Sequence, residues 1–171
     1  MKKLLIAFVL IFCVGAVSAQ SKIGHVNSQK LLDTLPSRKD ALMKLKEFET
    51  NGVKELKEME DDLNAAVAKY EKDSPNMAPI LKKIEEDKLM KKNQALQERE
   101  QSLNQEMQAY SQELNKPILE RVQKAVEIVA DRKKINYVID ETVTLYFKGG
   151  TDLTPEVLTE LLRLDAEATK N

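Results

Sequence analysis

The side chains that most often carry chemistry are scarce in this chain of 171 residues. His25 is the only histidine, and Cys13, the only cysteine, lies in an apolar run near the start. One histidine without a cysteine favours a side chain on a sheet face over a metal ligand or a catalytic base. Carboxylates are abundant, but acidic pairs arise by chance along solvated helices. We therefore predict no enzyme, no catalytic residue and no metal.

Glycines are equally scarce. Beyond the start of the chain only Gly24, Gly52, Gly149 and Gly150 occur, and they do not form a glycine-rich loop for phosphate groups. A nucleotide-driven mechanism is therefore not encoded, and we predict no cofactor.

The first 19 residues have the order of a secretory signal. Lys2 and Lys3 precede an apolar run over residues 4–17, and small residues follow up to Ala19. This run is shorter than the roughly 20 residues that cross a bilayer. The sequence predicts cleavage after Ala19, export to the periplasm and no integral membrane segment.

Composition limits the class of protein further. Cleavage takes two lysines from the 27 basic side chains and none from the 28 acidic ones, which leaves 25 against 28 and a net charge of −3. This balance argues against a nucleic-acid partner. With 32% charged and 5% aromatic residues, the chain is too polar for an ordinary globule and suits an elongated helical protein.

Two long amphipathic helices are predicted in the middle of the chain. Apolar residues recur at intervals of three to five over residues 37–73, and in a second helix, residues 80–134, they recur every seven residues from Leu89 to Tyr110. Residues 74–79 between the helices contain two prolines. This pattern predicts an antiparallel coiled-coil hairpin with residues 74–79 at its tip. Pro117 is expected to kink or restart the second helix.

Strand patterns lie at the two ends of the chain. Residues 22–27 alternate as a strand, and Ser28 is expected to cap a short helix that ends at Pro36. Residues 135–147 alternate with β-branched and aromatic side chains around a turn, which predicts a β-hairpin. Thr154 and Pro155 open a last helix.

The strands can meet at one end of the helical hairpin as a three-stranded sheet, so the predicted fold class is α+β and mostly α. Residues 1–19 form the signal, residues 20–36 and 117–171 the β-containing body, and residues 37–116 the helical hairpin. So small a sheet has exposed edges, and we expect subunits to close them against one another.

This layout resembles the Skp (OmpH-like) family of periplasmic chaperones over nearly the whole mature chain. The resemblance rests on KIGHVN, the charged hairpin, INYVIDETVTLYFKGG and DLTPEVLTELL, in this order behind a signal segment. It implies a homotrimer in which the terminal strands form a small β-barrel and three helical arms, or tentacles, enclose a cavity. It also implies that unfolded outer-membrane β-barrel proteins are held there without ATP. Peripheral contact with membrane or lipid stays open.

One departure from the family concerns charge. Its members are strongly basic, whereas the mature chain carries net −3, with seven lysines against five acids between Lys69 and Lys92 near the tip. We therefore expect apolar contact to matter more than charge in binding unfolded proteins.

Two sets of residues are candidates for function. The candidates for client contact are large flexible or aromatic side chains of the hairpin, each of which can instead pack in the seam: Met43, Phe48, Tyr70, Met77 and Met90. The candidates for the trimer interface are apolar strand residues: Ile23, Val26, Tyr137, Ile139, Val143, Leu145 and Phe147.

An envelope scaffold or spacer with one fixed protein partner is the alternative function. Such a scaffold is expected to keep its heptads apolar up to the tip. Asn93 and Glu100 are predicted to interrupt the seam, and polar interruptions let the arms splay, which favours the chaperone.

Overall fold

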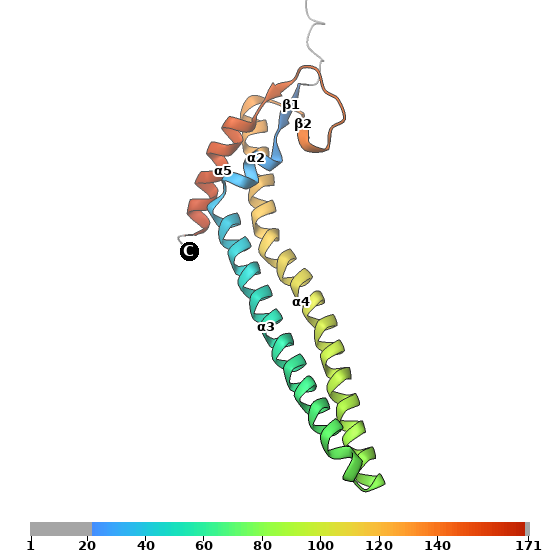
Figure 1. Cartoon of the computed structure of the whole chain (residues 1–171). Helices are drawn as coiled ribbons and strands as arrows, with labels where there is room; N and C mark the ends of the chain where they lie inside the picture. Colours follow the sequence, from blue (N-terminus) through green and yellow to red (C-terminus); the bar gives the residue numbers. More distant parts are fainter. Residues whose placement is uncertain (1–21, 170–171) are drawn as a thin grey trace, which may run out of the picture. The chain divides into compact units, whose positions relative to one another are not determined.

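The computed structural model describes residues 22–169 (Figure 1). The predicted signal segment and its cleavage after Ala19 lie outside the described residues. The described chain divides into two compact units, a helical hairpin over Leu35–Arg121 and a body formed by residues 22–34 together with residues 122–169.

The hairpin consists of two antiparallel helices that turn through a short 3-10 segment. Helix α3 spans Pro36–Asp73, the segment η2 spans Ser74–Asn76, and helix α4 begins at Pro79 and ends at Lys133 in the body (Figure 1). Each long helix begins with a proline. Proline suits this position because the backbone N–H of the first helical residue has no partner within the helix. The two predicted long helices are confirmed.

The seam between α3 and α4 contains one close backbone approach. A Cβ at Gly52 would lie 2.3 Å from Leu103 Cδ1. Leu103 therefore fills the space that a larger side chain at position 52 would need. The rings of Phe48 and Tyr110 pack with centroids 5.2 Å apart. The predicted heptad residue Leu103 is buried.

Polar side chains also cross the seam. Arg99 donates to Glu55 of α3 at 2.9 Å and to Glu106 of its own helix at 2.9 Å, and Lys92 pairs with Asp62. The hydrogen bond from Arg99 lowers the pKa of Glu55.

One expectation about α4 is wrong: Asn93 and Glu100 are exposed and do not interrupt the seam. The helix continues through Pro117, which excludes a restart there, and the alternative of a kink stays a prediction. Packing on both sides stabilises it there: Ile118 is buried, and Arg121 donates to Ser37 of α3 at 3.1 Å.

The body is a small sheet packed with helices (Figure 1). Strand β1 (Ile23–Val26) lies between β2 (Tyr137–Asp140) and β3 (Thr151–Asp152), and both outer strands pair with it in parallel. Helix α2 (Ser28–Thr34) follows β1, and α5 (Thr154–Ala168) follows β3. The prediction that strands from opposite ends of the chain meet is confirmed.

The predicted β-hairpin over residues 135–147 is wrong. After β2 the chain forms a 3-10 turn, η3 (Glu141–Val143), because the Asp140 carboxylate accepts a hydrogen bond from Thr142 N at 3.0 Å and closes the turn. The segment Val143–Phe147 forms no strand. The third strand is instead β3, which the chain reaches after Gly149 and Gly150, both at positive φ.

Alternation along β1 sends Gly24 and Val26 into the core. A Cβ at Gly24 would lie 2.7 Å from Leu153 Cδ1, so this leucine packs directly on the strand backbone. The remaining core comes from the helices and contains the buried residues Leu31, Ala125, Val129, Val157 and Leu161.

Hydrogen bonds fix both helix starts next to β1. Asn27 Oδ1 accepts from Lys30 N at 3.0 Å, so Asn27 caps α2, and the predicted cap Ser28 is wrong. Asn27 N donates to Thr154 Oγ1 at 3.1 Å, which joins the end of β1 to the start of α5.

Candidate functional sites

The face of the sheet opposite the core is apolar and exposed. The parallel register places Ile23 beside Tyr137 and His25 beside Ile139, with all four side chains on this outer face. Ile23, Tyr137 and Ile139 are 45%, 62% and 38% exposed. No described element covers the side chain of Tyr137, although aromatic and β-branched residues in strands usually pack against neighbouring side chains.

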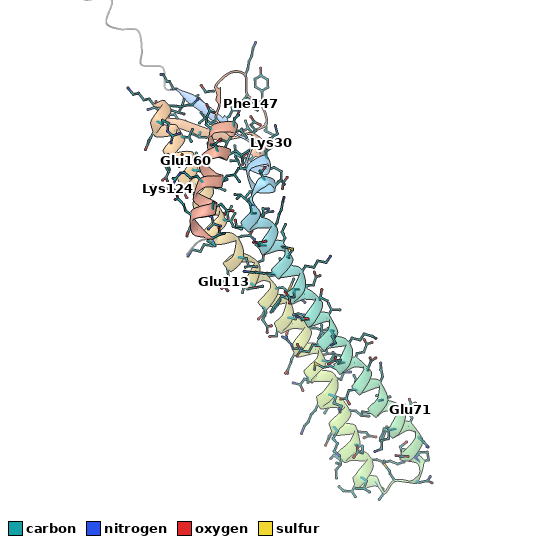
Figure 2. All side chains as sticks on the ribbon, turned by 90° about the vertical axis from the view of Figure 1, so that its left-hand side faces the viewer. Lys30, Glu71, Glu113, Lys124, Phe147 and Glu160 are labelled. Atoms are coloured by element: carbon teal, nitrogen blue, oxygen red, sulfur yellow. The ribbon has the colours of Figure 1, made fainter. Side chains whose placement is uncertain are left out.

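The segment after β2 extends this apolar surface. Val143, Leu145, Tyr146 and Phe147 are all exposed, and Leu145 is fully accessible. Figure 2 shows Phe147 in this segment, and its ring lies 4.9 Å from the ring of His25 on the outer face. Exposed large apolar side chains gathered in one region are candidates for an interaction site.

Six of the seven residues predicted for the trimer interface are exposed, on the sheet face or in the segment after β2, and together we call them the outer apolar face: Ile23, Tyr137, Ile139, Val143, Leu145 and Phe147. Val26 does not, because it is buried in the core of its own chain. The alternation of inward Gly24 and Val26 with outward Ile23 and His25 was the available signal. The sequence prediction mixed the two faces of β1.

His25 has two acidic neighbours that sequence reasoning missed. Its Nδ1 lies 2.6 Å from Glu141 Oε1, and the other oxygen of Glu141 accepts from Asn27 Nδ2 at 3.1 Å. Asp152 stands next to His25 in the β1–β3 register. Hydrogen bonds from Thr154 lower the pKa of Asp152, and the charge of His25 contributes in the same direction.

Ion pairs join α5 to the last turns of α4 within the body. Glu160, labelled in Figure 2, accepts from Arg163 at 2.6 Å and from Arg132 at 3.0 Å, and these bonds lower its pKa. Lys133 pairs with Glu156 and lowers the pKa of that carboxyl. Because Glu160 is itself buried at 8% exposure, its two arginine partners are needed to satisfy the charge.

The five residues predicted for client contact lie in different surroundings in the hairpin. Met43 and Met90 are exposed at 63% and 65%, and each lies outside the seam. Phe48 packs in the seam against Tyr110. Tyr70 and Met77 are half-buried at the tip.

The tip contains a cavity of about 350 Å³ between the two helices. Tyr70, Met77 and Leu89 supply apolar lining, and lysines and acids surround them. The Tyr70 hydroxyl donates to Glu86 at 2.5 Å, and this bond to a carboxylate raises the pKa of Tyr70. Figure 2 shows Glu71 near the same turn.

Exposed apolar side chains continue from the tip into the first turns of α4, where Ile80, Leu81 and Ile84 are 65%, 51% and 43% exposed.

Within residues 22–169, no helix has both the length and the apolar character needed to cross a bilayer.

The sequence is similar to that of known proteins. The family model described as outer membrane protein (OmpH-like) matches residues 22–161. The chaperone protein Skp of Photorhabdus laumondii is 31% identical over 94% of this chain and 99% of its own length. Chaperone protein Skp of Yersinia pestis is 36% identical with the same coverage.

A solved structure shows the same fold. An OmpH-like protein of Caulobacter crescentus superposes with a TM-score of 0.73 over 86% of this chain and 87% of its own, at 16% sequence identity. Fold and sequence together define the class as a helical-hairpin protein with a small sheet body. The chain belongs to the OmpH-like family, which includes the Skp chaperones, and the predicted resemblance is confirmed.

Proposed function

We propose that this protein is an ATP-independent holdase chaperone of the periplasm, active as a homotrimer, which binds unfolded outer-membrane β-barrel proteins between its helical arms. The proposal includes export through residues 1–19 with cleavage after Ala19. Its first support is membership of the OmpH-like family and the relation to proteins named chaperone Skp. In this role the protein holds its client and catalyses no reaction.

The observation that carries the proposal is the outer apolar face. A single chain leaves Ile23, Tyr137 and Ile139 exposed beside the apolar segment Val143–Phe147, and it also leaves β2 and β3 as sheet edges. Association of three copies through these surfaces would bury apolar area and protect the edges in a closed barrel. The proposed interface is therefore the six exposed residues of this face, with Val26 supporting it from the core.

The hairpin supports the other half of the proposal. Holding without an energy source requires many weak contacts that exchange quickly, and several tethered arms provide this because linked sites act at roughly millimolar effective concentration. Exposed Met43 and Met90 offer flexible apolar contacts, and the tip cavity brings Tyr70 and Met77 together. We propose these four residues as client contacts, with Phe48 contributing from the seam.

A turbidity assay tests the chaperone against the scaffold alternative. A urea-unfolded outer-membrane barrel protein is diluted into buffer with the mature chain, residues 20–171, at three chains per client. The expected result is suppression of light scattering by the aggregating client. Unchanged aggregation at this ratio would favour a scaffold with one fixed partner.

Removal of the outer part of the hairpin tests the division of labour between arm and body. Replacing Asn64–Gln94 by a short Gly-Ser turn leaves the body sequence intact. We expect the shortened protein to assemble like the full chain and to protect the client less. Loss of assembly in this variant would contradict the assignment of trimer contacts to the body.

A further inference from the structure

Three potential metal ligands converge on the outer face of the sheet. His25 on β1, Glu141 after β2 and Asp152 on β3 each offer one ligand atom, and these atoms all lie within 4.8 Å of one another. His25 is more than a hundred positions in the sequence from Glu141 and Asp152, and each of the three residues comes from, or directly after, a different strand of the sheet.

The backbone itself brings these ligands together. The parallel register pairs His25 with Asp152, so the two side chains stand next to each other on adjacent strands, about 4.8 Å apart at the backbone. Glu141 is the first residue of η3, and the turn closed by Asp140 and Thr142 directs it toward β1. The cluster therefore follows from sheet register and turn geometry rather than from flexible surface side chains.

Neighbouring groups also hold each ligand in place. Glu141 Oε2 accepts from Asn27 Nδ2 at 3.1 Å, and Asp152 Oδ1 accepts from the backbone N–H of Thr154 at 2.9 Å. The imidazole of His25 packs against Phe147, and a Cβ at Gly150 would lie 3.2 Å from its Cδ2. Support of this kind orients the ligands of metal sites in proteins.

The charges of the cluster favour a divalent cation. Glu141 lies 2.6 Å from the imidazole of His25, and Asp152 adds a second carboxylate at the same place. A divalent ion would balance both carboxylates and leave the imidazole neutral, which is the form that binds metals.

We propose that His25, Glu141 and Asp152 form a site for a transition-metal ion, with Zn²⁺ as the preferred occupant. One imidazole and two carboxylates, with water in the fourth position, suit zinc in tetrahedral geometry. Ligand atoms around one tetrahedral zinc ion lie about 3.3 Å apart. Glu141 Oε1, which lies 2.6 Å from His25 Nδ1, therefore moves slightly away from it when the ion binds. The bound ion links β1, β3 and the turn after β2.

The mature chain is well suited to a direct test. His25 is its only histidine and it has no cysteine, so binding through an imidazole or a thiolate has one possible location. Tag-free protein of residues 20–171 is titrated with Zn²⁺ against a chromophoric chelator, and with Co²⁺ followed by its visible absorption. We expect one ion per chain and a Co²⁺ spectrum typical of four-coordination.

Single substitutions assign the ligands. His25→Gln is expected to abolish the Co²⁺ spectrum, and Asp152→Asn and Glu141→Gln are each expected to weaken Zn²⁺ binding about tenfold or more. Glu113→Gln, which removes one carboxylate from the hairpin, is the matched control and should bind as the unaltered chain does. Circular dichroism checks that each variant is folded, and the conservative Asp152→Asn keeps the test valid if His25→Gln unfolds.

Stability gives an independent readout. Zn²⁺ in excess should raise the unfolding midpoint of the unaltered chain and of Glu113→Gln, because an ion that binds only the folded state stabilises it. It should raise the midpoint of Asp152→Asn less at the same Zn²⁺ concentration, because this variant binds the ion more weakly. Absence of saturable binding, or equal binding by His25→Gln, would overturn the proposal and leave an ordinary His25–Glu141 ion pair.

Discussion

The body and the hairpin are built in opposite ways. The body surrounds a core in which Leu31, Val129, Leu153 and Leu161 are fully buried, although its sheet has only three short strands. The hairpin consists of two long helices, yet few of its residues over 35–121 are buried: Leu35, Ala41, Gly52, Leu103 and Ile118. Packing therefore stabilises the body, whereas the hairpin depends on helix formation and on scattered contacts along its seam.

This difference fits two tasks. A unit that assembles with copies of itself needs a fixed shape behind its outer apolar face. A unit that contacts unfolded chains needs accessible side chains along its length. Substitutions in the two units should accordingly differ in their effect on stability, and the following experiments test that contrast.

The largest effect is expected in the core of the body. Leu161→Ala removes a fully buried side chain and leaves a cavity, which should lower the free energy of unfolding by about 2–5 kcal/mol. Leu162→Ala changes the adjacent residue of the same helix, which is 37% exposed, and should have a much smaller effect. Urea unfolding followed by circular dichroism measures both. Similar losses in the two variants would contradict the described core.

A second effect, expected in the hairpin, depends on the contact between Gly52 and Leu103. Gly52→Ala should destabilise the hairpin although alanine favours helices, because its Cβ would lie 2.3 Å from Leu103 Cδ1. In a Leu103→Ala background the clash is absent, and the same Gly52→Ala change should stabilise by about 1 kcal/mol. A double-mutant cycle by thermal unfolding measures this reversal of sign. Additive effects would show that the two residues are not in contact.

A smaller effect is expected from the ion pairs of the body as pH changes. The pKa values of Glu156 and Glu160 are lowered by Lys133 and by Arg163 with Arg132. Carboxylates with lowered pKa contribute stability above their unfolded value of 4.5, and that contribution is lost as pH falls below it toward the folded pKa. The unfolding midpoint should therefore fall in this range.

The variant Glu160→Gln isolates one of these groups. Its unfolding midpoint should be lower than that of the unaltered chain near neutral pH, and it should fall less steeply below pH 4.5, the ordinary value of the carboxyl it replaces. Parallel curves for the two proteins would mean that Glu160 does not gain stability from Arg163 and Arg132.

The smallest effect is expected for exposed ion pairs of the hairpin. Lys57 Nζ lies 3.7 Å from Asp61 on the same helix, and both side chains are largely exposed. Lys57→Ala should change the free energy of unfolding by less than about 0.5 kcal/mol. Chemical unfolding of this variant beside the unaltered chain provides the measurement. A loss above about 1 kcal/mol would show that this exposed ion pair stabilises the hairpin more than such pairs usually do.

The elements with a long repeating pattern could be predicted from the sequence. Periodicity gave α3 and α4 nearly to the residue, because many apolar positions determine a long helix together. The heptad assignment of Asn93 and Glu100 failed, since a seven-residue repeat drifts relative to an α-helix and neighbouring positions turn out of the seam.

Short strands and their pairing could not be predicted in the same way. Alternation identified β1 and β2, but the hydrogen bonds of Asp140 decide that η3 follows β2, and the glycines before β3 decide where the third strand lies. The neighbours of His25 depend on that register. They became visible only when the fold placed Glu141 and Asp152 beside it.

The central claim is that the outer apolar face assembles three chains, which together hold one unfolded client. Native mass spectrometry of residues 20–171, alone and mixed with a urea-unfolded outer-membrane barrel protein, tests it most directly. The account predicts the mass of three chains, then of three chains with one client, and single chains for Leu145→Asp, a residue fully exposed on the proposed interface. Single chains of the unaltered protein with no client bound would contradict it.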